Sequence, residues 1–238
     1  VFPDSGAVDV SLADLDVAAV TFSVPIHDDQ RIAENFLLFR ESEPVALRST
    51  DPVPVSDNEY GLAPAAGWQV GSSYTVQVSP AVTGPLGVSQ PISWQFHTAV
   101  PKVLSRTPDD GDNSVHIDDH QLKVVFDNAI DEAALADGGV RLLREGIEID
   151  SSVPSYVESA DSVIVKFAPL EGLQPGTSYQ AIISAAVGGP LRAVNDGDFS
   201  WRFSTSVPRM ESVFPDSGAV DVSLATLEVA AVTFSVPI

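Results

Sequence analysis

The sequence predicts an all-β chain made of tandem β-sandwiches, from its repeats, its short alternating segments and its turn clusters. Residues 1–26 and 213–238 are identical except at two positions. This identity returns after 212 residues, about twice the length of a small domain, so we expect a weaker repeat of half that length in between.

The weaker repeat is present as landmarks in the same order. Residues 64–74 match residues 169–179, and residues 94–98 match residues 201–205. The spacing between these landmarks is nearly constant, which indicates two homologous modules in tandem. Each module has its own aromatic residues for a core.

The repeat also sets the expected boundaries. We predict a first module over residues 1–100, a second over 101–207, and a linker with the first strands of a third over 208–238. Both joints begin with Val-Pro, at Val100-Pro101 and Val207-Pro208. Because proline fixes its own φ and restricts the residue before it, the joints are expected to be semi-rigid.

Short segments of both modules alternate apolar and polar residues with a period of two, as half-buried strands do. They include residues 74–78, 94–98, 163–167 and 199–203. Turn-forming clusters such as residues 195–198 separate them, and only residues 28–36 and 131–135 look locally helical. About seven short strands in about 105 residues predict a sandwich of immunoglobulin type.

One motif supports this prediction in both modules. Residues 173–179 and their counterpart, residues 68–74, each end in a tyrosine and resemble the tyrosine corner of Greek-key sandwiches. In that corner the tyrosine hydroxyl bonds back to the backbone where the chain crosses between sheets. The alternative is an ordinary turn followed by a strand tyrosine.

Together these motifs resemble the bacterial immunoglobulin-like domains. The resemblance rests on an opening Pro-Asp-x-Gly, on strands ending in Phe22 and Phe126, on Gly-x-x-Tyr, and on a closing Trp-x-Phe-x-Thr. It implies tandem immunoglobulin-like Greek-key β-sandwiches of the kind that recur in bacterial cell-surface and secreted proteins. It also implies a spacer, adhesin-stalk or filament role in an extracellular or cell-surface location, and it transfers no catalytic residue.

Charge and composition exclude several classes of partner. The net charge is −21, spread as −9 over residues 1–99, −9 over 100–212 and −3 over 213–238. Such a surface repels nucleic acid and anionic lipid, and no apolar stretch is long enough for membrane insertion. Cysteine is absent, so disulfides and thiolate chemistry are excluded. No nucleophile-elbow, Walker or dinucleotide motif occurs, and we expect a non-catalytic protein.

Calcium is the one cofactor for which the sequence offers candidate ligands. Asp109, Asp110, Asp112 and Asn113 follow the first joint directly. Carboxylate and amide oxygens are the ligands that Ca²⁺ prefers, and an ion there would stiffen the joint. A tight turn is the other interpretation, because Asp, Asn and Gly also favour turns.

A zinc site is a further alternative nearby. On a strand, His116, Asp118 and His120 would share one face and converge on an ion. The first module has no histidine in the equivalent region, which favours a solvent-facing strand edge instead.

The leading functional hypothesis is a structural array of modules forming an extended stalk or fibre. Its expected partners are neighbouring modules of the same array and, in a fibre, neighbouring chains that complete edge strands. The alternative is a carbohydrate- or protein-binding module, in some settings accessory to a distant enzyme domain. Trp68 is the best candidate for such binding, although the second module has Leu173 in its place.

Overall fold

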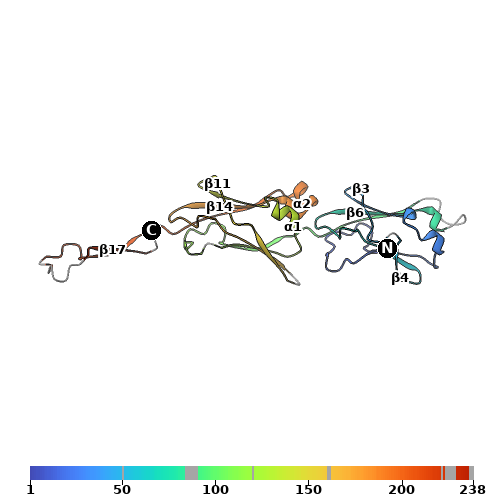
Figure 1. Cartoon of the computed structure of the whole chain (residues 1–238), viewed down its shortest axis with the longest axis horizontal. Coiled ribbons are helices and arrows are strands. Elements are labelled where there is room, and N and C mark those ends of the chain that lie inside the picture. The colour runs from blue at the N-terminus through green and yellow to red at the C-terminus, as the bar shows by residue number, and fades with distance from the viewer. Residues whose placement is uncertain are drawn as a thin grey trace.

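The computed structural model describes residues 1–49, 51–83, 91–119, 121–159, 162–220, 222 and 229–235. Figure 1 shows a first sandwich, a second sandwich and a hairpin arranged in line along the longest axis of the molecule. Within the residues that the structure describes, strands β1–β7 pair only with one another, as do strands β8–β15 and strands β16–β17. The exact module boundaries stay a prediction.

The first sandwich consists of two antiparallel sheets. One has the order β1 (Ala18–Thr21), β5 (Glu59–Leu62), β4 (Val53–Ser56). The other has the order β3 (Glu43–Pro44), β2 (Phe36–Arg40), β6 (Ser73–Val78), β7 (Ile92–His97). An isolated bridge between Phe2 and Ala19 adds the chain start to the first sheet.

The second sandwich repeats this plan. One sheet has the order β12 (Ser155–Ser159), β13 (Ser162–Phe167), β9 (Leu122–Phe126), β8 (Val103–Thr107). The other has the order β11 (Ile147–Ile149), β10 (Val140–Arg144), β14 (Ser178–Ile183), β15 (Phe199–Ser204). This division of strands between two sheets is that of the immunoglobulin fold, so the predicted fold class is confirmed.

A second feature of that fold occurs in both sandwiches. The segment after the opening turn crosses to the other sheet, where it forms a parallel bridge with the last strand. Val10 bridges Thr98 in the first sandwich, and Val115 bridges Thr205 in the second. Each sandwich is thereby closed by the same residue of its Trp-x-Phe-x-Thr motif.

Helical turns are few. Residues 131–135 were predicted to be helical, and α1 (Glu132–Ala136) lies there with Asp131 as its N-cap. Residues 28–36 form two 3-10 turns, η1 (Asp28–Gln30) and η2 (Ala33–Asn35). The prediction missed η3 (Pro80–Thr83), η4 (Ala185–Gly188) and α2 (Pro190–Asn195) because short Gly- and Pro-containing segments carry no helical periodicity.

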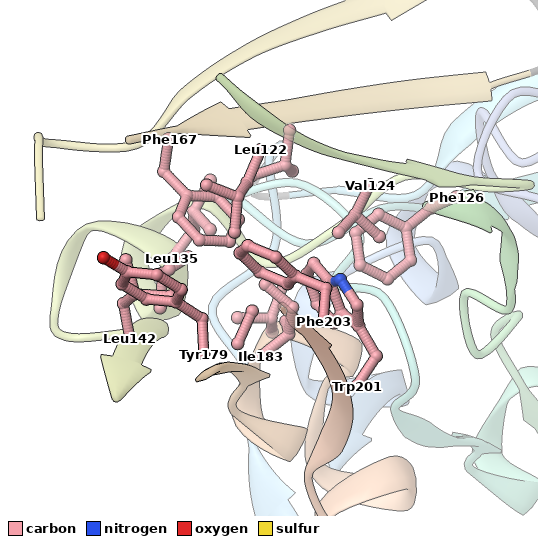
Figure 2. Packing of buried hydrophobic residues seen from close by; sticks show 14 of the residues in the cluster. Leu122, Val124, Phe126, Leu135, Leu142, Phe167, Tyr179, Ile183, Trp201 and Phe203 are labelled. Atoms are coloured by element: carbon pink, nitrogen blue, oxygen red, sulfur yellow. The ribbon is translucent and has the colours of Figure 1, made fainter. Parts of the chain in front are cut away.

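Each sandwich has a separate aromatic core. In the second, the rings of Tyr179 and Phe203 stack with centroids 5.4 Å apart, and Phe167 meets Trp201 edge to face. Figure 2 shows these rings packed between the two sheets with aliphatic residues of β9 and β10. Strand β13 alternates half-buried and buried residues, as the period-two pattern predicts.

The hairpin of β16 (Met210–Phe214) and β17 (Ala231–Phe234) repeats the pairing of β8 with β9. Its apolar residues are exposed: Val232 is 53% exposed, whereas Val20 at the same place in the first sandwich is 3% exposed. The core face of the hairpin is therefore not covered by the second sandwich. Among the described residues, no helix is long and apolar enough to span a membrane.

Candidate functional site

The loop between β5 and β6 is fixed by a tyrosine corner. The hydroxyl of Tyr74 accepts a hydrogen bond from the backbone N–H of Gln69, 2.9 Å away. In the second sandwich the hydroxyl of Tyr179 accepts one from Gln174, 2.8 Å away. The prediction of a tyrosine corner is confirmed in both copies, since an ordinary turn would not require this bond.

The same loop is held from the other side by Thr98. Its hydroxyl donates to the carbonyl of Gln69 at 2.6 Å and accepts from the N–H of Ser72 at 2.9 Å. Thr205 makes the equivalent bonds to Gln174 and Thr177 in the second sandwich. The closing threonine thus anchors a loop at the end of each sandwich, where the next module begins.

Burial of the corner tyrosine has an electrostatic consequence. Desolvation raises the pKa of Tyr74 above its ordinary value of 10.0, although the Gln69 bond and Arg40 work in the opposite direction. The neutral phenol is therefore the form that the folded loop stabilises.

Residues 69–72, which we call the docking loop, contact the second sandwich. The carbonyl of Gly71 accepts a hydrogen bond from the N–H of Leu191, and the two atoms are 2.7 Å apart. The Arg192 side chain donates to the carbonyl of Pro101 at 3.4 Å. These two bonds link residues 191–192 of the second sandwich to the first sandwich and to the joint. Figure 1 shows α1 and α2 at this end of the second sandwich.

The contact is backbone against backbone and requires glycine on both sides. A Cβ atom at Gly71 would overlap the carbonyl oxygen of Gly188, and one at Gly189 would overlap the carbonyl oxygen of Val70. Gly71 also has a φ of +55° and Gly189 a φ of +82°, which other residues rarely adopt. The two sandwiches approach closely enough here that no side chain fits between them.

Two hollows separate the sandwiches elsewhere at the joint. A hollow of about 330 Å³ lies beside the contact, between Ser11 and Leu12 of the first sandwich and Asp127 and Glu158 of the second. A neighbouring hollow of about 380 Å³ is lined by Trp68 among others. The close glycine contact is therefore small, and the hollows beside it are lined partly by acidic residues.

The predicted calcium ligands lie in a turn whose carboxylates already have protein partners. Asp110 accepts from the N–H of Arg202 at 3.0 Å, and Asp112 accepts from both the N–H and the hydroxyl of Ser114 at 2.9 and 3.0 Å. Asp109 and Asn113 are exposed. The turn interpretation accounts for these bonds, and the calcium site stays a prediction.

The same turn exists without the carboxylate cluster in the first sandwich. There Gly6 donates to the carbonyl of Gln95 at 2.7 Å, as Gly111 donates to that of Arg202 at 2.7 Å. The peptide bonds before Pro3 and Pro108 are both cis. The backbone of this turn is thus the same with or without the additional aspartates.

The zinc alternative is only partly described. His116 and Asp118 approach each other, with Nδ1 and Oδ2 3.4 Å apart, and both are exposed. His120 lies outside the described residues. Within the described part of the chain, no group of three or more His, Cys, Asp or Glu residues is arranged to hold a metal ion.

Trp68 is used inside its own sandwich. Its indole N–H donates to the carbonyl of Asp16 at 3.1 Å, and its ring meets Tyr74 edge to face with centroids 4.8 Å apart. It also packs at an angle against Phe96. This placement favours a structural tryptophan over a ligand-binding one.

The glycine contact was not predicted from the sequence, although two sequence patterns involve the residues that form it. Gly71 and Gly176 occupy the same place in the repeated motif, three residues before the corner tyrosine. The adjacent pair Gly188-Gly189 was the other clue. Neither pattern indicates by itself that the two segments meet.

Comparison with known proteins gives a family match for the second sandwich. Residues 97–205 match the family model described as a bacterial Ig-like domain. No curated protein matches this chain.

Several solved structures are similar to this chain, among them a tandem of titin Ig domains. Rst D1-D2 is 12% identical with a TM-score of 0.32, covering 87% of this chain and 98% of its own. The titin Ig tandem A164-A165 is 11% identical with a TM-score of 0.29, covering 86% and 93%. The S-layer protein rSbsC is 13% identical with a TM-score of 0.29, covering 88% and 26%. The TM-scores are low, so the fold assignment rests on the strand order and on the family model.

Proposed function

We propose that this chain, whose second sandwich matches a bacterial Ig-like domain and whose first sandwich repeats its strand order, serves as a non-catalytic, semi-rigid spacer within an extended stalk or fibre. The observation that carries the proposal is the glycine contact between the two sandwiches, with Leu191 donating to Gly71 at 2.7 Å. A spacer transmits length and direction, which requires modules held at a fixed angle. This contact supplies such a constraint.

The joint peptide supports the same role. Lys102 donates its N–H to the side chain of Asp127 at 2.7 Å, and Asp127 returns its N–H to the carbonyl of Lys102 at 3.0 Å. These bonds attach the chain to the second sandwich at Lys102, immediately after Pro101, which is buried. Only a very short segment is therefore left to flex between the two cores.

The charge distribution is consistent with an extended array. The net charge of −21 is spread nearly evenly over the two modules. Like charges along the rod repel one another, which keeps the surface hydrated and disfavours collapse of one module onto another. We place the protein outside the bacterial cell or at its surface, with neighbouring modules as its main partners.

Lateral assembly into a fibre is a separate part of the proposal. The exposed core face of the β16–β17 hairpin is the surface on which a neighbour would complete a sandwich. Completion by the remainder of a third module in the same chain would use the same face. The two cases differ in whether the chain self-associates as its concentration rises.

Solution scattering of the full 238-residue chain tests the spacer. We expect one in-line arrangement of the two sandwiches to fit the scattering curve without averaging over orientations. A curve that requires a broad ensemble of angles between the sandwiches would contradict a semi-rigid spacer.

A further inference from the structure

The far end of the second sandwich carries a loop that matches the docking loop. Residues 174–177 repeat the hydrogen bonds of residues 69–72: Gly176 donates to the carbonyl of Ser206 at 3.0 Å, as Gly71 donates to that of Ala99 at 2.9 Å. The tyrosine corner and the closing threonine hold both loops in the same way. The two loops therefore present the same backbone at equivalent ends of their sandwiches.

The surroundings of the two loops differ. Gly71 is buried by the second sandwich, whereas Gly176 is exposed. A Cβ atom at Gly176 would meet only Val207 of its own module, 3.7 Å away. Among the described residues, no amide donates to the carbonyl of Gly176. The second loop thus has the shape of the first without its partner.

The chain also leaves the second sandwich as it leaves the first. Arg209 donates its N–H to the side chain of Ser235 at 3.0 Å, and Ser235 donates to the carbonyl of Arg209 at 2.8 Å. These bonds repeat the pairing of Lys102 with Asp127 at the first joint. The hairpin therefore begins in the same relation to its joint as the second sandwich does.

We propose that residues 174–177 are a docking surface for another Ig-like module, which presents a counterpart of the turn at residues 188–191. In that turn a glycine pair is followed by Pro190 and by the Leu191 amide, which donates to the Gly71 carbonyl at the first joint. The docked module donates the equivalent amide to the carbonyl of Gly176. This inference rests on the proposed spacer function and deepens it, because it assigns the surface that fixes each successive joint.

One sequence difference between the loops leaves the backbone carbonyl of the contact in place. Position 70 is valine in the first loop, and position 175 is proline in the second. At the first joint the close approach of Gly189 is to the backbone carbonyl of Val70, and proline carries the same carbonyl. The geometry is therefore set by backbone atoms that both loops share.

A chain with two such joints tests the proposal. In it, residues 1–207 are followed directly by a second copy of residues 101–207, so that Val207-Pro101 reproduces the natural Val100-Pro101 joint. The amide of Leu191 in each copy is followed by hydrogen exchange. We expect both amides to exchange at least about tenfold more slowly than an exposed amide, because each is bonded across a joint.

Two glycine substitutions distinguish the loss of docking from the backbone strain that alanine causes at a positive φ. Gly176 and Gly172 both have positive φ, but a Cβ at Gly172 meets nothing within 4 Å. We expect Gly176→Ala to accelerate exchange of the second Leu191 amide while leaving the first unchanged, and Gly172→Ala to affect neither. A second Leu191 amide that exchanges freely in the parent chain, or that is unaffected by Gly176→Ala, would overturn the proposal.

A thiol readout keeps the test independent of hydrogen exchange. The chain has no cysteine, so Pro175→Cys introduces a single thiol at the position where Val70 is 4% exposed in the first joint. We expect this thiol to react about tenfold more slowly in the two-joint chain than in the natural chain, because docking covers it. Leu170→Cys is the control, since Leu170 is 67% exposed and its counterpart Ala65 is exposed too.

Equal reactivity of the Pro175→Cys thiol in the two chains would refute docking at residues 174–177. That result would leave the first joint intact, since Gly71 and Leu191 are unchanged in both chains. Failure of the spacer proposal would instead appear as free exchange of the first Leu191 amide. The two proposals can therefore fail separately.

Discussion

The carbonyl of Gly71 and the amide of Leu191 join two separately folded sandwiches through one backbone hydrogen bond of 2.7 Å. The two backbones can approach because neither Gly71 nor Gly189 has a Cβ, which would overlap the carbonyl oxygen of Gly188 or of Val70. The relative orientation of the modules is thus set by a contact between folded surfaces as well as by the proline-containing joint.

Gly71→Ala is expected to loosen this joint. The added Cβ would overlap the carbonyl oxygen of Gly188, so the sandwiches must separate and Leu191 loses its acceptor. Gly67→Ala is the matched control, because Gly67 has a φ of +80° and nothing lies near its Cβ position. Both changes cost about 1–2 kcal/mol of backbone strain in the first sandwich. Only Gly71→Ala should accelerate exchange of the Leu191 amide, and equal exchange in the two variants would refute the contact.

Tyr74→Phe is expected to lower the free energy of unfolding of the first sandwich by about 1 kcal/mol near neutral pH, because the N–H of Gln69 loses its acceptor. Urea unfolding measures the change. Tyr179→Phe removes the equivalent bond to Gln174 and should cost the second sandwich a similar amount. A negligible cost in both would show that the corner bond does not stabilise the loop.

The Tyr74 contribution also depends on pH. Burial raises the pKa of Tyr74 in the folded state above its ordinary value of 10.0. Its stabilisation is therefore complete below pH 10 and is lost as the pH rises through the folded-state pKa. We expect the difference in unfolding free energy between the parent and Tyr74→Phe to narrow as the pH rises above 10. A difference that widens there would contradict the direction of the shift.

Asp112→Ala is expected to destabilise the second sandwich by about 1 kcal/mol, because two hydrogen bonds from Ser114 are lost. Asp109→Ala, at an exposed position in the same turn, is the control and should cost less. Thermal unfolding with and without a calcium chelator distinguishes the two interpretations of this turn. A midpoint that falls on chelation in the parent, but not in Asp112→Ala, would establish the calcium site.

Val20→Ala and Val232→Ala compare one residue in two environments. The surrounding sequences are nearly identical, but Val20 is 3% exposed and Val232 is 53% exposed. We expect Val20→Ala to cost about 2 kcal/mol in the first sandwich and Val232→Ala to change stability by less than about 0.5 kcal/mol. Calorimetry of the full chain measures both. A similar large cost at Val232 would mean that the hairpin is covered, in solution, by a neighbouring chain.

The fold was largely predictable because its signals are local and repeated. Tyr74 and Tyr179 recur at the same place in the motif, and each bonds to a backbone amide five residues before it. Alternation along β13 likewise encodes one buried face within a single strand. Such features require only neighbouring residues to be interpreted correctly.

The joint was not predictable for the opposite reason. Gly71 has a positive φ, so its presence is fully explained by a local turn, and nothing in that turn indicates Gly188 as a neighbour. The aspartates present a similar ambiguity. Asp112 has the chemistry of a calcium ligand, but only the structure shows its carboxylate bonded to Ser114.

Residual dipolar couplings measured on the full 238-residue chain test the fixed joint most directly, because they report the orientation of each sandwich on the timescale of module motion. We predict that one alignment tensor fits the couplings of both sandwiches in the parent chain, and that Gly71→Ala requires two. Two tensors of clearly different magnitude in the parent chain would show that the sandwiches move independently, and would contradict a spacer fixed by Gly71 and Leu191.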